Sequence, residues 1–429
     1  MNNKHSIICL ALLAATVYLV GLIARSSYAG GDTRPLNEQL VSFLQDYIRI
    51  ETTHPNPAYD KALSFLKKHA LADGFTYQEV SLPSGNTAAI ISFIGTSPEL
   101  PALALNHHMD VVPASAEGWI TPPFAGEIYA GSIIGRGTQD MKGIGATHYF
   151  ALKELKEHGF VPKRSIHIFA VPDEEVGGFK GTKEFVQTDQ FKQLNIGFIV
   201  DEGHASGNEQ ILDIKVAERK PIQIRITGKG ELAHGSHLAA HNAIHDLVQF
   251  LDQIIAIHVS QQSQVGSKQP GELLSMNISS LTAGIKKENG HIALNMVPDS
   301  AQATIDIRVP PTMKKRDVKK MLDDKIKHYP DLNYVILAEA EEEPELKDFK
   351  TSLYCALSKS IEQFGLCPQP HYFEASSDLR FYQARGIDGV GFTPFAIADN
   401  IHGINESVPV DQLIRGKDIT VHFIKEFCG

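Results

Sequence analysis

Residue types that bind metal ions occur in two short segments in the first third of the chain. His108 and Asp110 follow the apolar run 102–105, which predicts a buried strand. Because side chains alternate along a strand, both residues leave the end of this strand on the same side. A histidine beside a carboxylate is a common pairing at metal sites, since the carboxylate can hold the ring nitrogen that faces away from the metal. Asp140 lies on a turn after Gly137, from which its carboxylate could reach the same point.

Further acidic and histidine residues follow other predicted elements. Glu174 and Glu175 come after the predicted strand 165–171, Asp201 after the strand 196–200, and His402 lies in a turn near the C-terminus. Each of these residues alone has an ordinary explanation as a solvated or core side chain. A joint set of His, Asp and Glu without Cys suits a pair of catalytic metal ions better than a structural zinc site.

The composition is that of an ordinary globular protein with room for two domains. The chain has 429 residues, 43% of them hydrophobic and 21% charged. Its net charge of -10 argues against a nucleic-acid-binding protein, which usually carries a basic face. The four cysteines form no Cys-x-x-Cys pair, so a cysteine zinc site is not expected. Whether a disulfide forms among Cys355, Cys367 and Cys428 is left open.

The N-terminal segment predicts export. Residues 7–23 form an uncharged apolar run that ends before Arg25, and residues 27–29 offer the small side chains that a signal peptidase reads. The run is longer than a typical signal core and just long enough to span a bilayer. We therefore interpret residues 1–29 as a signal peptide or a membrane anchor. Both interpretations place the catalytic part outside, in the periplasm or the extracellular space.

The order of strand and helix patterns predicts two domains. Strands alternate with helices over residues 35–216, which indicates an α/β sheet covered on both faces. Open sheets of this kind place their sites at strand ends, where the polar candidates fall. Residues 217–342 change to the order β-α-β-β-α-β, typical of a small antiparallel-sheet domain. The α/β unit resumes over residues 343–429, so the expected fold is α/β with an inserted α+β domain.

Several ordered motifs resemble those of a known family. They are HMDVVP at 108–113, RGTQDMK at 136–142, VPDEEVGG at 171–178, DEG at 201–203, AHGS at 233–236, NMVP at 295–298, DIR at 306–308, SDLR at 377–380 and GFTP at 391–394. They are similar to those of the zinc aminoacylase/carboxypeptidase family, which includes acetylornithine deacetylase and succinyl-diaminopimelate desuccinylase. Within it they most resemble the aminoacylase-1 type. The resemblance implies a zinc-exopeptidase-like catalytic domain with an inserted lid domain that forms a homodimer.

The resemblance also implies two Zn²⁺ ions per subunit and a catalytic base. The implied metal ligands are His108 and Asp201 for one ion, Glu175 and His402 for the other, and Asp140 bridging both. Three carboxylates would cancel three of the four positive charges, and the remaining charge would favour the oxyanion formed when an amide is attacked. Glu174 would be the general base, and Asp110 would orient His108.

The inserted domain contains further residues that match family motifs. Arg308 would clamp the carboxylate of the substrate with its planar fork of donors. His234 would stabilise the oxyanion, contributed across the dimer to the other subunit. Asn295 and, in the catalytic domain, Arg380 would position the substrate.

The function that this resemblance implies is metal-dependent hydrolysis of N-acyl-L-amino acids, which releases a carboxylic acid and an L-amino acid. A carboxypeptidase or dipeptidase remains an alternative, because both substrates offer an amide next to a free carboxylate. Hydrolysis or synthesis of N-fatty-acyl amino acids is a second alternative. A metal-poor binding dimer is disfavoured, because Glu174 and Asp140 are both present. The less acidic segment 403–406 leaves the rim of the site, and so the substrate preference, open.

Overall fold

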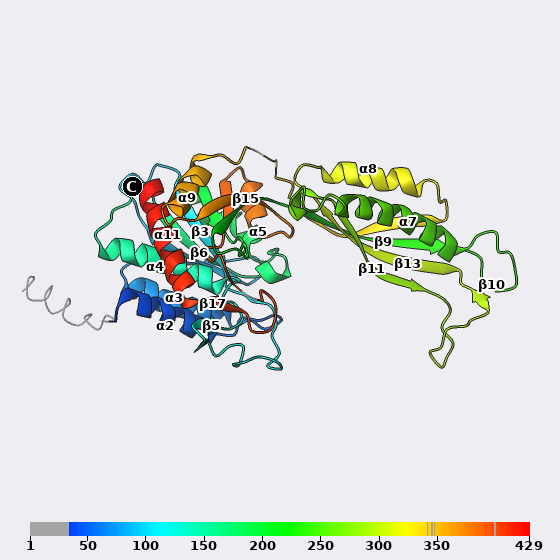
Figure 1. Ribbon diagram of the computed structural model, residues 1–429, viewed down its shortest axis with the longest axis horizontal. Coiled ribbons are helices and arrows are strands. Elements are labelled where there is room, and N and C mark those ends of the chain that lie inside the picture. The colour runs from blue at the N-terminus through cyan, green and yellow to red at the C-terminus, as the bar shows by residue number, and fades with distance from the viewer. Residues whose placement is uncertain (1–33, 341, 345, 347, 399) are drawn as a thin grey trace, which may run out of the picture.

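The computed structural model describes residues 34–340, 342–344, 346, 348–398 and 400–429. The chain forms a larger and a smaller lobe, which lie end to end along the long axis of the molecule (Figure 1). The predicted export segment 1–29 lies outside the described residues and stays a prediction. Within the described ranges, no helix is both long and apolar enough to cross a membrane.

The larger lobe is built on a mixed sheet of eight strands. In spatial order they are β1 (Thr76–Ser81), β2 (Thr87–Phe93), β6 (Ile166–Val171), β3 (Ala102–His108), β7 (Ile196–Asp201), β16 (Asp388–Phe392), β8 (Ile211–Glu218) and β15 (Cys367–Phe373). The central strands β6, β3, β7 and β16 are parallel neighbours, whereas β1, β2 and β6 pair antiparallel. The carboxyl ends of β6, β3 and β7 therefore meet at one edge of the sheet, where open α/β sheets place their sites.

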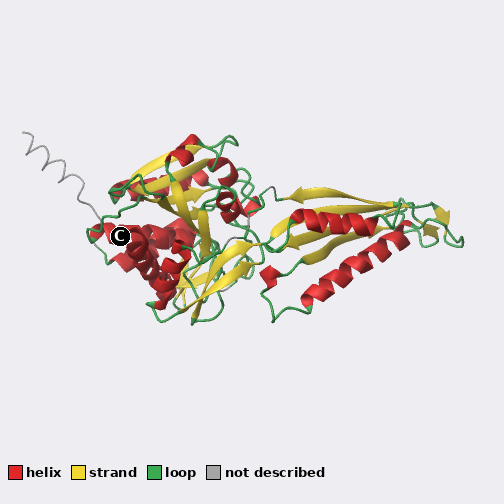
Figure 2. Ribbon diagram, turned by 90° about the horizontal axis from the view of Figure 1, so that it is seen from above, coloured by secondary structure: helices red, strands yellow, loops and turns green. Residues whose placement is uncertain are grey.

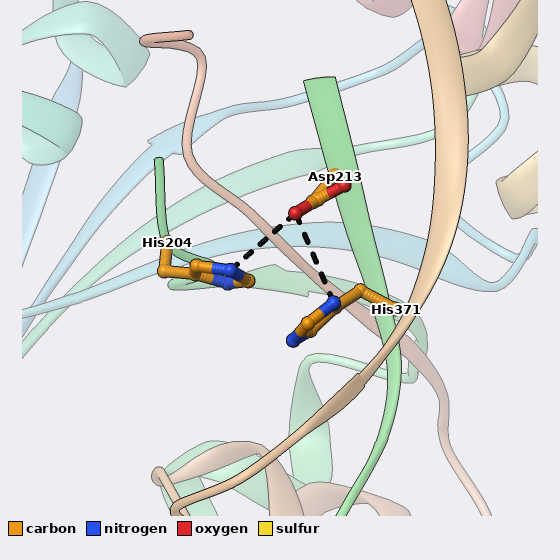
Figure 3. A group of neighbouring side chains, drawn as sticks. All are labelled: His204, Asp213 and His371. Carbon is orange, nitrogen blue, oxygen red and sulfur yellow. Dashed lines mark ion pairs between the residues drawn. The ribbon is translucent and has the colours of Figure 1, made fainter. Parts of the chain in front are cut away.

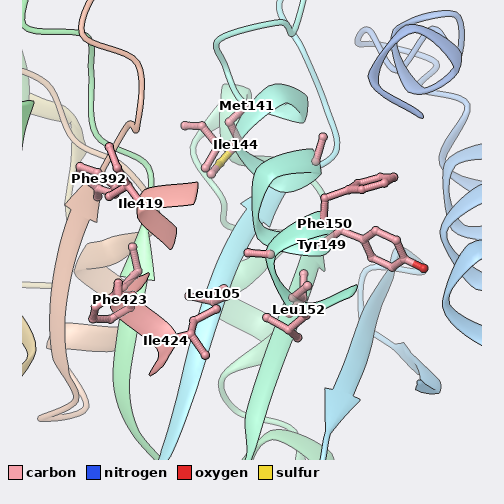
Figure 4. Packing of buried hydrophobic residues seen from close by; sticks show 14 of the residues in the cluster. Leu105, Met141, Ile144, Tyr149, Phe150, Leu152, Phe392, Ile419, Phe423 and Ile424 are labelled. Atoms are coloured by element: carbon pink, nitrogen blue, oxygen red, sulfur yellow. The ribbon is translucent and has the colours of Figure 1, made fainter. Parts of the chain in front are cut away.

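Helices cover both faces of this sheet. They are α2 (Leu36–Ile48), α3 (Tyr59–Ala72), α4 (Lys142–Glu157), α5 (Thr182–Phe185), α6 (Asp189–Gln193), α9 (Ser352–Glu362), α10 (Leu379–Gln383) and α11 (Val410–Cys428). Every side chain of β3 is buried, and successive ones enter different cores: Leu105 packs with α4 and α11, while Ala104 packs with Phe169 and Phe185 on the other face. Figure 4 shows Leu105 between Leu152 and Ile424. The predicted α/β class is confirmed.

A short three-stranded sheet joins two segments that are distant in the sequence. It consists of β4 (Glu127–Tyr129), β5 (Ser132–Ile134) and β17 (Ser407–Pro409). The antiparallel register pairs Ile134 with Ser407. The turn that carries Asp140 follows β5, and the loop that carries His402 precedes β17. Because β5 and β17 pair, the sheet brings the turn and the loop together.

The smaller lobe is a separate antiparallel sheet. Its strands, in spatial order, are β11 (Ser275–Ala283), β13 (Ser300–Val309), β9 (Lys220–Lys229) and β14 (Leu332–Glu339). Helices α7 (Ala243–Gln262) and α8 (Lys315–Ile326) cover one face, as Figure 2 shows. Alternate residues of β9, among them Ile222 and Ile224, point into the core beneath them. The element order is the β-α-β-β-α-β order that the sequence predicts, and the role of this lobe as a lid stays a prediction.

Candidate metal centre

His108 is the last residue of β3 and directs one ring nitrogen towards an acidic residue. Its Nδ1 lies 2.8 Å from the main-chain oxygen of Asp110. A carbonyl oxygen only accepts hydrogen bonds, so Nδ1 donates its proton there and Nε2 is the nitrogen that faces the acidic groups. This Nε2 lies 2.7 Å from Oδ1 of Asp140. Because Nδ1 is held by the main chain, Nε2 is the nitrogen that His108 can offer to a metal ion.

Asp140 lies between two histidines that are distant from one another in the sequence. Its second oxygen, Oδ2, lies 3.0 Å from Nε2 of His402. One carboxylate thus faces two imidazole nitrogens, one from each side. A carboxylate in this position could bridge two metal ions.

Glu202, rather than Asp201, joins His108 and Asp140. Oε2 of Glu202 lies 3.7 Å from Nε2 of His108, and the ligand atoms of these three residues lie within 4.8 Å of one another. The carboxylate of Asp201 instead accepts hydrogen bonds from Asn106 at 2.8 Å and Ser377 at 3.3 Å. Neighbouring residues at a strand end point to opposite sides, and β7 ends with Asp201 turned into the protein. The structure therefore groups Glu202, and not the predicted ligand Asp201, with His108 and Asp140.

A second group contains Asp140, Glu175 and His402, whose ligand atoms also lie within 4.8 Å of one another. Oε2 of Glu175 lies 3.3 Å from Nε2 of His402, and its Oε1 accepts the amide N–H of Val112 at 3.2 Å. The side chain of His402 is 50% exposed, so this half of the centre faces solvent. The two groups share Asp140 and no other residue.

Asp110 has a different role from the one expected. Its Oδ1 lies 3.7 Å from Nδ1 of His108, which is beyond hydrogen-bonding distance. Its two oxygens instead accept the amide N–H groups of Glu174 at 3.2 Å and Glu175 at 3.0 Å, and Oδ2 also lies 3.2 Å from His54. The main-chain carbonyl of Asp110 orients the histidine, while its carboxylate fixes the turn Glu174–Val176.

Glu406 is a buried positioning residue that the sequence analysis missed. It pairs with Arg136 at 2.6 Å and accepts the amide N–H of Gly137 at 3.0 Å. Arg136 also donates to the main-chain oxygen of His402 at 3.0 Å. This pair therefore joins the turn of Asp140 to the loop of His402. The partners of Glu406 are mainly main-chain groups about 270 residues away, so no sequence motif marks it.

The acidic groups of the centre are crowded. Burial, and then the charge of Asp140, raises the pKa of Glu202 to about 8 and raises that of Glu175. Burial and then Glu202 raise the pKa of Glu174 well above its usual range. Hydrogen bonds to Asp140 and Glu175 raise the pKa of His402 to about 10. Crowded carboxylates of this kind are stabilised by positive charge, so this set of two histidines and three carboxylates fits a pair of divalent metal ions.

The two arginines expected at the substrate have other partners. Arg380 donates to the main-chain oxygens of Gly177 at 2.7 Å and Ser377 at 2.5 Å, so it supports the turn after Glu175. Arg308 lies on β13 of the smaller lobe and pairs with Asp306 at 2.7 Å. The structure does not bring Arg308 together with the metal-binding groups.

His234 and Asn295 lie together but far from the metal-binding groups. Nδ2 of Asn295 lies 3.3 Å from Nε2 of His234, and both side chains are exposed. His234 ends the strand β10 (Ala233–His234), and Asn295 directly precedes the strand β12 (Met296–Val297). Figure 1 shows β10 at the end of the smaller lobe that is farthest from the larger lobe. Within a single chain, these two residues are therefore not part of the centre.

Comparisons with known proteins give matches that span both lobes. Residues 104–426 match peptidase family M20/M25/M40. Mouse aminoacylase-1 is 32% identical over 386 residues, which cover 88% of this chain and 93% of that protein. The fold resembles a metallo-carboxypeptidase of the M20 family from Sulfolobus solfataricus, with a TM-score of 0.72, 16% identity and coverage of 91% and 99%. It also resembles a dinuclear metal binding peptidase of that family from Bacillus subtilis, with a TM-score of 0.61, 13% identity and coverage of 91% and 98%.

Proposed function

Because the chain belongs to peptidase family M20/M25/M40, we propose that this aminoacylase-like hydrolase cleaves the amide bond of N-acyl-L-amino acids with two bound Zn²⁺ ions. The observation that carries this proposal is the position of Asp140, which lies 2.7 Å from His108 and 3.0 Å from His402. His108 and Glu202 would hold one ion, and Glu175 and His402 the other. The products are a carboxylic acid and an L-amino acid, which gives the enzyme a role in amino acid metabolism.

The ions would supply positive charge that stabilises the oxyanion developing on the amide. The protein contributes the fixed positions of the ligands. Asp110 and Glu406 hold the turns of Glu175 and Asp140 through main-chain N–H groups. Such outer contacts keep ligands in the geometry that binding requires.

Glu174 is the proposed general base. Its main chain is fixed by Asp110, while its half-buried carboxylate has no hydrogen-bond partner among the residues that the structure describes. In its ionised form this carboxylate would take a proton from the attacking water and pass it to the leaving amine. Its neighbour Glu175 faces His402, so the turn directs the two carboxylates to different tasks.

We further propose that two copies associate through the smaller lobe. This would bring His234 and Asn295 to the metal centre of the other copy, where the family resemblance expects them. Helix α7 supports the proposal, because Val248, Ile255 and Val259 expose large apolar side chains. They are seven and four residues apart, so they lie along one face of the helix. Closure of this lobe would also be needed for Arg308 to reach the substrate carboxylate.

The experiment that tests the function is a comparison of substrates. Purified enzyme is given N-acetyl-L-methionine, N-palmitoyl-L-methionine and the dipeptide Gly-L-Met, and the methionine released is quantified. We expect N-acetyl-L-methionine to be hydrolysed with the highest kcat/KM. Glu174→Gln, which keeps the size of the side chain, should lose about 10²–10⁴-fold in kcat while retaining its zinc.

Each other result has a defined meaning. Preference for Gly-L-Met would replace the proposal with a dipeptidase, and preference for the palmitoyl substrate would replace it with a fatty-acyl amino acid hydrolase. Undiminished turnover by zinc-loaded Glu174→Gln would remove Glu174 from the role of base.

A further inference from the structure

A second set of metal-binding side chains lies outside the proposed centre. His204, Asp213 and His371 converge in Figure 3, and their ligand atoms lie within 4.8 Å of one another. His204 follows β7, Asp213 lies on β8, and His371 lies on β15. None of the three belongs to a motif of the family resemblance, and none is shared with the groups around Asp140.

The distances suit ligands around an ion better than direct hydrogen bonds. Oδ2 of Asp213 lies 3.4 Å from Nε2 of His204 and 3.8 Å from Nδ1 of His371. Ordinary hydrogen bonds between such atoms measure about 2.7–3.2 Å. Four ligands at about 2.1 Å from a tetrahedral metal are separated from one another by about 3.4 Å. The two imidazoles therefore share one carboxylate oxygen at close to the spacing of a coordination sphere.

The other ring nitrogen of His371 has the partner that a metal ligand needs. Nε2 lies 3.2 Å from Oε2 of Glu374. A carboxylate only accepts when it is ionised, so this contact places the proton on Nε2 and leaves the lone pair on Nδ1. Nδ1 is the nitrogen that faces Asp213. A carboxylate behind a ligating histidine is a common arrangement at zinc sites.

His204 is fixed by ring packing rather than by hydrogen bonds. Its ring centroid lies 4.2 Å from that of His371 and 5.6 Å from that of Phe373. Its Nδ1 is buried and has no hydrogen-bond partner among the described residues. The ring thus directs Nε2 at Asp213, while 26% exposure of its side chain leaves a path for an ion and for a water ligand.

The strands explain why Asp213 and His371 face one another. Strands β8 and β15 are parallel, and Asp213 is the partner of Gln369. His371 lies two residues further along β15, so its side chain leaves the same face of the sheet as that of Gln369. His204 completes the group from a loop that begins two residues earlier at Glu202.

We propose that His204, Asp213 and His371 form an additional metal site for Zn²⁺ or a similar transition metal, with Glu374 as the outer partner of His371. Two imidazoles and one carboxylate are ligands that this class of metal prefers, and water takes the fourth position. The bound ion would tie the loop of Glu202 to β8 and to the edge strand β15. It is a structural site, because no part of the proposed reaction uses these residues.

The test is the number of zinc ions bound per chain. The full chain is stripped with a chelator, reloaded with Zn²⁺, dialysed and analysed for metal, and circular dichroism verifies folding. We expect Asp213→Asn and His371→Gln to hold one zinc fewer than the wild type. His245→Gln, at an exposed position on α7, is the matched control and should hold the wild-type number. Equal zinc content in the wild type, Asp213→Asn and His371→Gln would overturn the proposal.

A variant that lacks the proposed catalytic pair of ions tests this site separately. Asp140→Ala should lose the two paired zinc ions but keep about one zinc per chain. The double variant with Asp213→Asn should lose this remaining zinc as well. Complete loss of zinc in Asp140→Ala alone would refute the additional site and leave the proposed function untouched. If Asp213→Asn or His371→Gln does not fold, Glu374→Gln replaces it. We expect that variant to bind the ion about 10-fold more weakly, and unchanged affinity would contradict the assignment.

Discussion

The carboxylate of Asp110 holds the main chain of Glu175, whose amide N–H donates to Oδ2 at 3.0 Å. Asp110 is fully buried, and Glu175 lies in the turn that presents the proposed base and a proposed metal ligand. The sequence suggested that this aspartate supports the histidine two residues before it. The structure shows instead that its side chain supports a turn more than 60 residues away.

Replacing Asp110 by Ala should therefore disturb the base more than the histidine. We expect Asp110→Ala to lower kcat by about 10- to 100-fold, because the two amide N–H groups of the turn lose their acceptor. His54→Gln is the control, since it removes the other partner of Asp110 and leaves both main-chain contacts. The measurement is kcat with N-acetyl-L-methionine in zinc-loaded protein. Wild-type turnover in Asp110→Ala would show that the turn holds its geometry without this carboxylate.

Glu202 and Asp201 offer a direct comparison of neighbouring carboxylates. We expect Glu202→Gln to lose one of the paired zinc ions, because its oxygen lies beside His108. Asp201→Asn keeps an acceptor for Asn106 and should retain both ions of the pair. The number of zinc ions bound by each variant shows which of the two carboxylates is the metal ligand. Loss of zinc from Asp201→Asn alone would restore the assignment made from the sequence.

The sequence was sufficient where local pattern decides the structure. The apolar runs of β3 and β6 are buried on both faces and were recognisable as strands. The motifs also placed His108, Asp140, Glu175 and His402, which the structure brings together in two overlapping groups. Choosing Glu202 over Asp201 required the side to which each residue at the end of β7 points, and the residue types do not reveal this.

The sequence was insufficient where distant contacts decide the structure. Strand β8 was not recognised, because it carries the charged residues Asp213, Lys215 and Glu218 in a buried position. Lys215 and Glu218 neutralise one another at 2.8 Å. Strand β15 was not recognised either, because it contains Pro368 and Pro370. Proline is tolerated there because β15 is the edge strand of the sheet.

A buried histidine away from the centre should make stability depend on pH. Burial in α4 lowers the pKa of His148 from 6.5 to about 3. Between these values the unfolded chain binds a proton that the folded chain does not. The contribution of uncharged His148 to the free energy of unfolding is therefore complete above pH 6.5. It is lost as the pH falls towards 3, by at most about 1.4 kcal/mol per pH unit.

Replacing His148 removes its share of this pH dependence. We expect the free energy of unfolding of His148→Leu to fall less steeply between about pH 6 and pH 4.5 than that of the wild type. Urea unfolding of metal-free protein at several pH values gives the slopes. His245→Leu on the exposed side of α7 is the control and should keep the wild-type slope. Equal slopes for His148→Leu and the wild type would mean that His148 is protonated in the folded protein.

The central claim is that paired metal ions around Asp140 drive hydrolysis of N-acyl amino acids. Its most direct test is methionine release from N-acetyl-L-methionine by the full chain before chelation, after chelation and after Zn²⁺ is restored, with Asp140→Ala measured in parallel. We predict that chelation abolishes release, that Zn²⁺ restores it, and that Asp140→Ala stays inactive throughout. Unchanged release from protein shown to be free of metal, or full activity of Asp140→Ala, would contradict the account.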